Sequence, residues 1–155
     1  MPQHLRFPLA LTLFSIVFVS NISEAARIPG PHKGKIFRTG KTAIEFTVDK
    51  DSHPHIFRLD EKNATMALGA MRVSMKALTP KKTITIRLSR TQEGLGKETD
   101  ELDHLAGASP MPPPDEYPVE ITVTLGKQVK KYKLIFIEGF CAECAMPAFS
   151  CTCPG

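Results

Sequence analysis

Alternation of apolar and polar residues over short stretches is the feature that most limits the fold of this chain. Thr42–Asp49 reads TAIEFTVD, which puts Ile44, Phe46 and Val48 on one face of an extended strand. The other face carries the polar residues Glu45, Thr47 and Asp49. Side chains of a strand point alternately to opposite faces, so this pattern indicates a half-buried antiparallel strand with a polar outer face. No stretch has sustained helical periodicity, and we expect an all-β protein.

Five other stretches are expected to be strands on the same grounds: His55–Asp60, Ala70–Lys76, Lys82–Ser89, Pro118–Leu125 and Lys131–Glu138. The last of them becomes apolar on both faces towards its end, which predicts a central strand. The short segment Gly126–Gln128 predicts a hairpin turn. Six or seven short strands in one domain predict a small antiparallel β-sandwich that is immunoglobulin-like in general architecture.

The segment between Thr91 and Tyr117 interrupts the alternating pattern. It contains several glycines and the proline run PMPPP, and it is long for a loop in a compact domain. Within it, DELDHLAG at residues 100–107 is expected to form either a helical turn or a short strand.

Residues 1–25 have the layout of a secretory signal peptide. Pro8–Ser20 is almost wholly apolar, and the small residues Ser23 and Ala25 precede the expected cut. The apolar run has about thirteen residues, whereas an ordinary membrane span needs roughly twenty. We therefore expect cleavage, a β-sandwich domain over residues 26–139, no integral membrane segment in the mature chain, and a periplasmic or secreted location. An uncleaved membrane anchor is the alternative.

The charge distribution argues against a nucleic-acid partner. The chain carries 20 Lys and Arg residues against 16 Asp and Glu, a net charge of +4. These basic residues are scattered and do not form a stripe with interleaved aromatic residues. The densest run consists of Lys127, Lys130, Lys131 and Lys133. We expect it to be a solvated face or the lysine-blunted edge of a sheet.

The cysteines are concentrated at the end of the chain, in a cysteine-rich tail over residues 140–155. All four lie here in the pattern C-x2-C-x6-C-x-C, as Cys141, Cys144, Cys151 and Cys153. Two thiolate pairs on tight turns can converge to give four sulfur ligands, which suit Zn²⁺ in a tetrahedral site, and soft thiolates also suit Cu(I). The tail therefore predicts a metal site for zinc or copper.

Two other interpretations of the tail remain open. An exported chain with an even number of cysteines is also typical of a disulfide framework, here two disulfides with three possible pairings. These cysteines can bridge only one another, and such short loops contribute the least stabilisation. A redox role for C-x2-C is disfavoured, because Glu143 lies between Cys141 and Cys144 and no helix is expected to follow.

No catalytic residues can be assigned from the remaining sequence, and we do not expect an enzyme. His53 and His55 flank Pro54 at an expected turn, while His32 and His104 lie in other connecting segments. Histidines at turns can bind metal, but solvent-exposed histidines are the preferred interpretation for all four. Two methionines invite a copper interpretation, but they share a strand face with a valine and are expected to be core residues. They are Met71 and Met75.

The opening PHKGKIFRTGKTAIEFTVD and the terminal C-x2-C and C-x-C pairs resemble a family of small exported β-sandwich proteins of Gram-negative bacteria, of verrucomicrobial and planctomycete types. That family is functionally uncharacterised, and related modules occur near adaptor subunits of heavy-metal efflux systems. This chain departs from the family opening, since Lys33 stands in place of the first glycine of a GG pair and Gly34 keeps the second. The resemblance implies that the four cysteines are ligands and that a protein of an efflux or envelope system is a partner.

The sequence therefore predicts an exported β-sandwich protein that binds zinc or copper through its four cysteines, without catalysis. The alternative is a structural or protein-interaction domain whose tail is locked by two disulfides.

Overall fold

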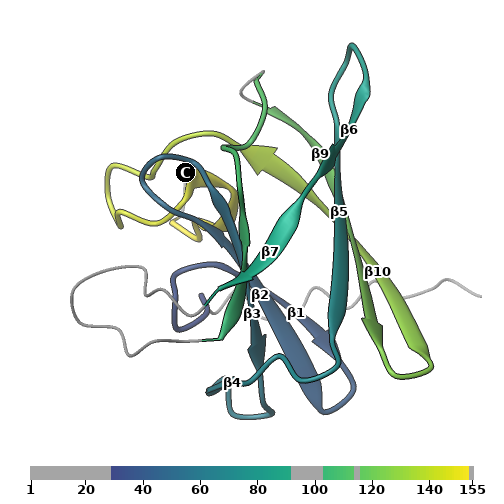
Figure 1. Ribbon diagram of the computed structural model, residues 1–155. Coiled ribbons are helices and arrows are strands. Elements are labelled where there is room, and N and C mark those ends of the chain that lie inside the picture. Colours follow the sequence, from purple (N-terminus) through teal and green to yellow (C-terminus); the bar gives the residue numbers. More distant parts are fainter. Residues whose placement is uncertain (1–28, 92–102, 114–115, 154–155) are drawn as a thin grey trace, which may run out of the picture.

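The computed structural model describes residues 29–91, 103–113 and 116–153, which form ten β-strands and one turn of 3-10 helix (Figure 1). The expected signal peptide, residues 1–25, lies outside this range. None of the described residues belongs to a helix that is long and apolar enough to cross a membrane. The expectation of an all-β fold built from antiparallel strands is confirmed.

The strands form two sheets. One has the order β1-β2-β3-β8-β7, with the short β4 also paired to β3, and we name it sheet A. Its strands are β1 (Lys35–Thr39), β2 (Thr42–Val48), β3 (Pro54–Leu59), β4 (Thr65–Met66), β7 (Leu88–Thr91) and β8 (His104–Gly107). The second, sheet B, has the order β10-β9-β5-β6. Its strands are β5 (Arg72–Leu78), β6 (Thr83–Ile86), β9 (Glu116–Leu125) and β10 (Gln128–Ile137).

The two sheets share one hydrophobic core. The inward faces of β2 and β3 contribute Ile44, Phe46 and Ile56, and sheet B contributes residues such as Met75 and Ile121 to the same buried cluster. Burial of this continuous apolar surface supplies the main driving force for the fold. The alternation in the sequence therefore identified the core face of these strands correctly.

The stretch Lys82–Ser89 was expected to be one strand, and this is wrong. The chain changes sheets at Arg87, so that β6 pairs with β5 in sheet B while β7 pairs with β8 in sheet A. Alternation alone does not show such a change, because Ile86 before it and Leu88 after it both pack against the shared core. In the irregular segment, β8 fulfils the second of the two expectations, a short strand.

The expectation that Lys131–Glu138 is a central strand is also wrong. Among the described residues β10 pairs only with β9 and forms one edge of sheet B. Ile135 and Ile137 are 48% and 40% exposed, so the apolar run reflects an apolar outer surface. The neighbouring lysines 130, 131 and 133 are exposed on the same strand, in agreement with a lysine-blunted edge. The hairpin turn is confirmed, because Leu125 pairs with Gln128.

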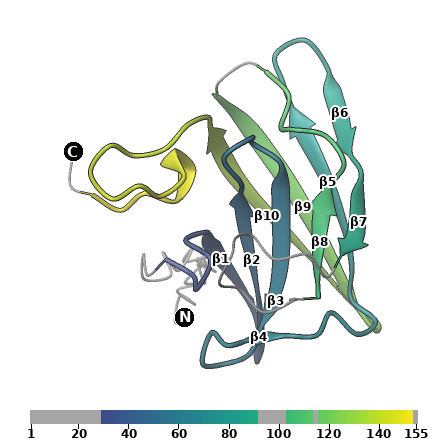
Figure 2. The ribbon, with the colours of Figure 1, turned by 60° about the vertical axis from the view of Figure 1, so that its left-hand side comes forward.

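The outer face of sheet A is covered, although the sequence predicted a solvated polar face. Glu45 and Thr47 are at most 2% exposed. The segment Pro29–Gly34 lies over this face, and the ring of His32 stacks on that of Phe57 with centroids 3.8 Å apart. Figure 2 shows the C-terminal tail on the same side of the molecule as this N-terminal turn. Polar residues at the outward positions are therefore buried beneath two irregular segments.

Candidate metal centre

The first cysteine pair lies on a tight turn directly after β10. Phe140 and Pro147 form an isolated antiparallel bridge at its base. Within the turn, the N–H of Ala145 donates to the carbonyl of Cys141 at 2.9 Å. Ala145 adopts a φ of +53°, the left-handed conformation that reverses the chain immediately after Cys144. The local backbone therefore holds the C-x2-C segment in a compact loop.

The second cysteine pair follows the 3-10 turn Ala148–Ser150. The N–H of Cys151 donates to the carbonyl of Ala148 at 3.3 Å, which fixes Cys151 at the end of this turn. The N–H of Cys153 then points at the Sγ of Cys151, at 3.4 Å. Such N–H···S contacts stabilise negative charge on sulfur.

The four sulfurs form one cluster, in which all Sγ atoms lie within 4.8 Å of one another. The Sγ atoms of Cys141 and Cys153 are 3.9 Å apart, and those of Cys144 and Cys151 are 3.6 Å apart. A disulfide needs about 2.05 Å, so neither pair is at bonding distance. A tetrahedral site with zinc–sulfur bonds of about 2.3 Å has sulfur–sulfur edges of roughly 3.8 Å. The two separations lie on either side of this value.

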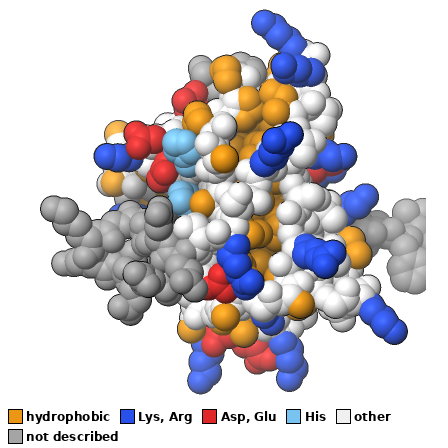
Figure 3. Space-filling model, in the orientation of Figure 1, with side chains coloured by type: hydrophobic (Ala, Val, Ile, Leu, Met, Phe, Trp, Pro, Cys, Tyr) orange, Lys and Arg blue, Asp and Glu red, His pale blue; other side chains and the backbone are white. Residues whose placement is uncertain are grey.

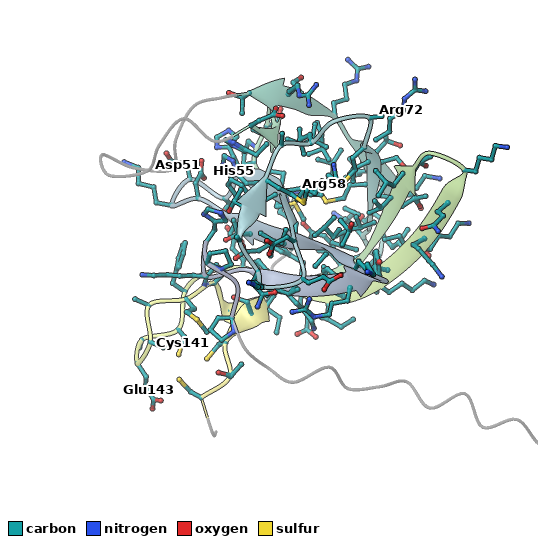
Figure 4. All side chains as sticks on the ribbon, turned by 90° about the horizontal axis from the view of Figure 1, so that it is seen from below. Asp51, His55, Arg58, Arg72, Cys141 and Glu143 are labelled. Atoms are coloured by element: carbon teal, nitrogen blue, oxygen red, sulfur yellow. The ribbon has the colours of Figure 1, made fainter. Side chains whose placement is uncertain are left out.

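Figure 4 shows the sulfur atoms gathered inside the tail near the labelled Cys141, while the side chain of Glu143 points outward. Each of the four cysteines is half-buried. The structure thus brings together all four residues that the sequence nominated as ligands.

The pKa values of the Cys141 and Cys153 thiols are shifted in opposite directions. The backbone N–H of Cys144 lowers the pKa of Cys141 to about 6, with help from the thiol of Cys151 and the N–H of Glu143. Hydrogen bonding to the sulfurs of Cys144 and Cys151 raises the pKa of Cys153. The cluster by itself therefore favours a thiolate at Cys141 and opposes one at Cys153. A bound cation would supply the charge that four thiolates require.

The segment between the two cysteine pairs is anchored in the sandwich. Phe149 is buried in the main core, with ring centroids 5.0 Å from Phe46 and 5.5 Å from Phe136. The hydroxyl of Ser150 donates to the carbonyl of Lys33 at 2.9 Å. The sulfur cluster is therefore held against the end of the sandwich at two points, one apolar and one polar.

The methionines are core residues, as expected. Met71 is 6% exposed and Met75 is fully buried, and both belong to the shared core. By contrast, the expectation of solvent-exposed histidines is wrong for His55 and His104, which are 8% and 1% exposed. Both lie on the covered outer face of sheet A. A signal was present in the sequence, because His55 alternates with Phe57, an apolar residue on the presumed solvent face.

These two histidines form a hydrogen-bonded pair. The Nδ1 atom of His55 lies 3.0 Å from the Nε2 atom of His104, and the Nε2 atom of His55 lies 3.4 Å from Oδ2 of Asp49. Phe57 packs between the rings of His104 and His32, with centroids 4.6 Å and 3.8 Å away. The imidazoles therefore have fixed positions in a row across the outer face of sheet A.

Burial keeps the imidazoles of His32 and His55 uncharged. Desolvation, together with the neighbouring His104 and His55, lowers the pKa of His32 to about 4. Desolvation also lowers the pKa of His55, against the opposing effect of Asp49. At neutral pH these two rings therefore carry lone pairs rather than charge.

A pocket of about 580 Å³ opens between this histidine row and the tail. Sheet A supplies His55 and His104, and the tail supplies Phe140, Ala145 and Pro147. Figure 3 shows histidine atoms at the surface beside acidic side chains. The pocket has both apolar walls and converging polar groups, as small-ligand sites do.

A buried carboxylate fastens the N-terminal turn that forms one rim of this pocket. The Oε1 atom of Glu45 accepts the N–H groups of Gly34 and His32, at 2.7 Å and 2.9 Å, while Oε2 has no hydrogen-bond partner. Burial raises the pKa of Glu45 to about 7 despite these two donors. A side chain at Gly30 would collide with the carboxyl group, so glycine is needed at this position.

Scans of this chain against protein-family models, curated proteins and solved structures found no match.

Proposed function

We propose that this chain is an exported protein that binds one Zn²⁺ ion through Cys141, Cys144, Cys151 and Cys153. The observation that carries the proposal is the sulfur geometry, with separations of 3.6 Å and 3.9 Å between pairs and all four atoms within 4.8 Å. A four-sulfur tetrahedron favours zinc over copper among the two metals that the sequence suggested. Export is inferred from the leader at residues 1–25.

The proposed site binds metal and does not catalyse. Four protein sulfurs fill every position of a tetrahedral ion and leave none for a substrate, which is typical of closed zinc sites. Because the cysteines are half-buried at the end of the sandwich, the ion remains within reach of a chelator or of a partner protein. Sequestration or delivery of metal in the envelope, beside an efflux or envelope protein, is the role that we assign.

Substitution tests the ligand set. We expect the Cys144→Ser and Cys151→Ser variants, one from each pair, to bind zinc with at least tenfold lower affinity, because a hydroxyl is a poor replacement for a thiolate. Glu143→Gln is the matched control in the same loop and is expected to retain one zinc per chain. Elemental analysis after dialysis against buffered zinc provides the measurement. Full zinc content in both serine variants would rule out the four-sulfur site.

A further inference from the structure

The histidine pair on the outer face of sheet A calls for an explanation beyond the four-cysteine site. His55 and His104 lie on the neighbouring strands β3 and β8. His55 is paired with Ala106, two residues after His104 on the same face of β8. Both side chains are nearly inaccessible, yet both border the open pocket. Two buried ring nitrogens 3.0 Å apart must share either a proton or an ion.

From this geometry we propose that His55 Nδ1 and His104 Nε2 form a second metal site, which takes a divalent ion of the imidazole-binding class, such as Ni²⁺, Cu²⁺ or Zn²⁺. The proposal does not depend on the four-cysteine site. It assigns the two histidines as the protein ligands and leaves the remaining coordination positions to water or a small ligand in the pocket.

The position of Asp49 supports ligation by His55. A carboxylate can only accept, so the Nε2 of His55 must carry the proton in its contact with Oδ2 of Asp49 at 3.4 Å. The lone pair of a neutral His55 then lies on Nδ1, the atom that faces His104. A carboxylate behind the far nitrogen is the usual support of a metal-binding histidine.

The spacing of the two nitrogens fits adjacent ligands of one ion. With metal–nitrogen bonds of about 2.1 Å, a separation of 3.0 Å corresponds to an angle of about 90° at the metal. This is the angle between neighbouring ligands in square-planar and octahedral sites, the geometries of Cu²⁺ and Ni²⁺. Phe57 stacks on His104 and holds that ring in place beside His55.

The charges around the pocket are mixed. Asp49 favours a cation, whereas Lys33 and Lys50 at the rim oppose one. Both lysines are exposed, so solvent and salt screen their charges. The pocket of about 580 Å³ leaves room on its open side for the water or small ligand that completes the coordination.

The test uses the full mature chain, first given one equivalent of Zn²⁺ and then titrated with Ni²⁺, which does not oxidise thiolates. We expect one further metal ion per chain with the zinc content unchanged, measured by equilibrium dialysis and elemental analysis. His55→Gln and His104→Gln are expected to weaken Ni²⁺ binding at least tenfold. Asp49→Asn acts through His55 and should have a smaller effect.

His53→Gln is the matched control, because His53 lies two positions before His55, just ahead of β3, and outside the pair. It is expected to bind Ni²⁺ as the unaltered protein does. Retained zinc and strand circular dichroism show that the glutamine variants are folded, so a loss of Ni²⁺ binding in them is local. A variant with Cys141→Ser and Cys144→Ser is expected to lose zinc but keep Ni²⁺, which separates this site from the first.

Three results would overturn the second site. They are the absence of any additional ion up to millimolar Ni²⁺, displacement of zinc by Ni²⁺ without an added equivalent, and unchanged binding in both glutamine variants.

Discussion

At the residue scale, the N-terminal turn shows how single positions determine local structure. Lys33 has a φ of +62°, a conformation that suits glycine and strains other residues. The neighbouring Gly34 has no room for a side chain, because a Cβ atom there would meet the backbone of Phe46. This turn therefore needs glycine at one position and tolerates lysine at the other at a cost.

Replacing Lys33 with glycine is expected to stabilise the protein by about 0.5–1 kcal/mol, because relief of left-handed strain exceeds the entropy that glycine adds to the unfolded chain. Urea denaturation at pH 7 provides the measurement. Lys50→Gly is the control, since exposed Lys50 has no positive φ. Lys50→Gly should lower the free energy of unfolding by a similar amount. A loss of stability in Lys33→Gly would show that the turn is not strained.

Glu45 and His32 are expected to impose opposite pH dependences on folding. The folded pKa of Glu45, about 7, is above its ordinary value. Its contribution to the stability of the fold is therefore fully present below pH 4.5 and is lost as the pH rises through 7. The folded pKa of His32, about 4, is below its ordinary value, so its contribution is present above pH 6.5 and is lost as the pH falls through 4. In the unaltered protein the two largely offset each other.

The Glu45→Gln variant removes the contribution of Glu45 and leaves that of His32. Relative to the unaltered protein, its free energy of unfolding is expected to rise by about 2–3 kcal/mol between pH 5 and pH 8. Denaturation at several pH values tests this. Glu120→Gln is the control, because Lys133 lowers the pKa of that half-buried carboxyl group and the small change should have the opposite sign. A difference in free energy that does not change with pH would mean that folding does not raise the pKa of Glu45.

At the element scale, the cysteine tail is joined to the sandwich through the segment between its two pairs. Phe149 fills the end of the core between Phe46 of sheet A and Phe136 of sheet B. The chain therefore cannot place its second cysteine pair without docking this ring. Packing of one aromatic side chain links the geometry of the sulfur cluster to the stability of the fold.

Phe149→Ala is expected to lower the free energy of unfolding by about 3 kcal/mol, in the range for an aromatic ring removed from a core. Zinc affinity should fall with it, because the second cysteine pair loses its anchor. Phe140→Ala is the control in the same tail, since Phe140 is 46% exposed and should change stability by less than about 1 kcal/mol. Equal effects of the two substitutions would show that Phe149 does not anchor the tail.

Much of the strand pattern could be predicted from the sequence, and the errors of that prediction have physical causes. Alternation reports which side chains share a face, so it identified Ile44, Phe46 and Val48 as core residues. It does not report what lies over the opposite face, and the burial of Glu45 and His55 depends on irregular segments without periodicity. The cysteine cluster was predictable because its members are close in sequence. The pair of His55 and His104 joins residues 49 positions apart and required the register of sheet A.

At the scale of the whole molecule, the cysteine cluster lies at one end of a sandwich whose main core is built by the sheets. Removal of the metal at neutral pH is therefore expected to free the thiols and lower the melting temperature while the strand circular dichroism persists. Affinity for zinc should also fall steeply in acid, because thiolates must be deprotonated to bind. Chelator titration followed by circular dichroism and thiol labelling measures both. Loss of the strand signal on chelation would contradict this arrangement.

We propose above all that the four cysteines hold a metal ion as thiolates. The most direct test is the intact mass under native and denaturing conditions, with elemental analysis, of mature protein purified from an oxidising compartment without chelator. We predict one zinc per chain in the native state and four alkylatable thiols after denaturation. A chain four hydrogens lighter with no metal would contain two disulfides and would contradict the account.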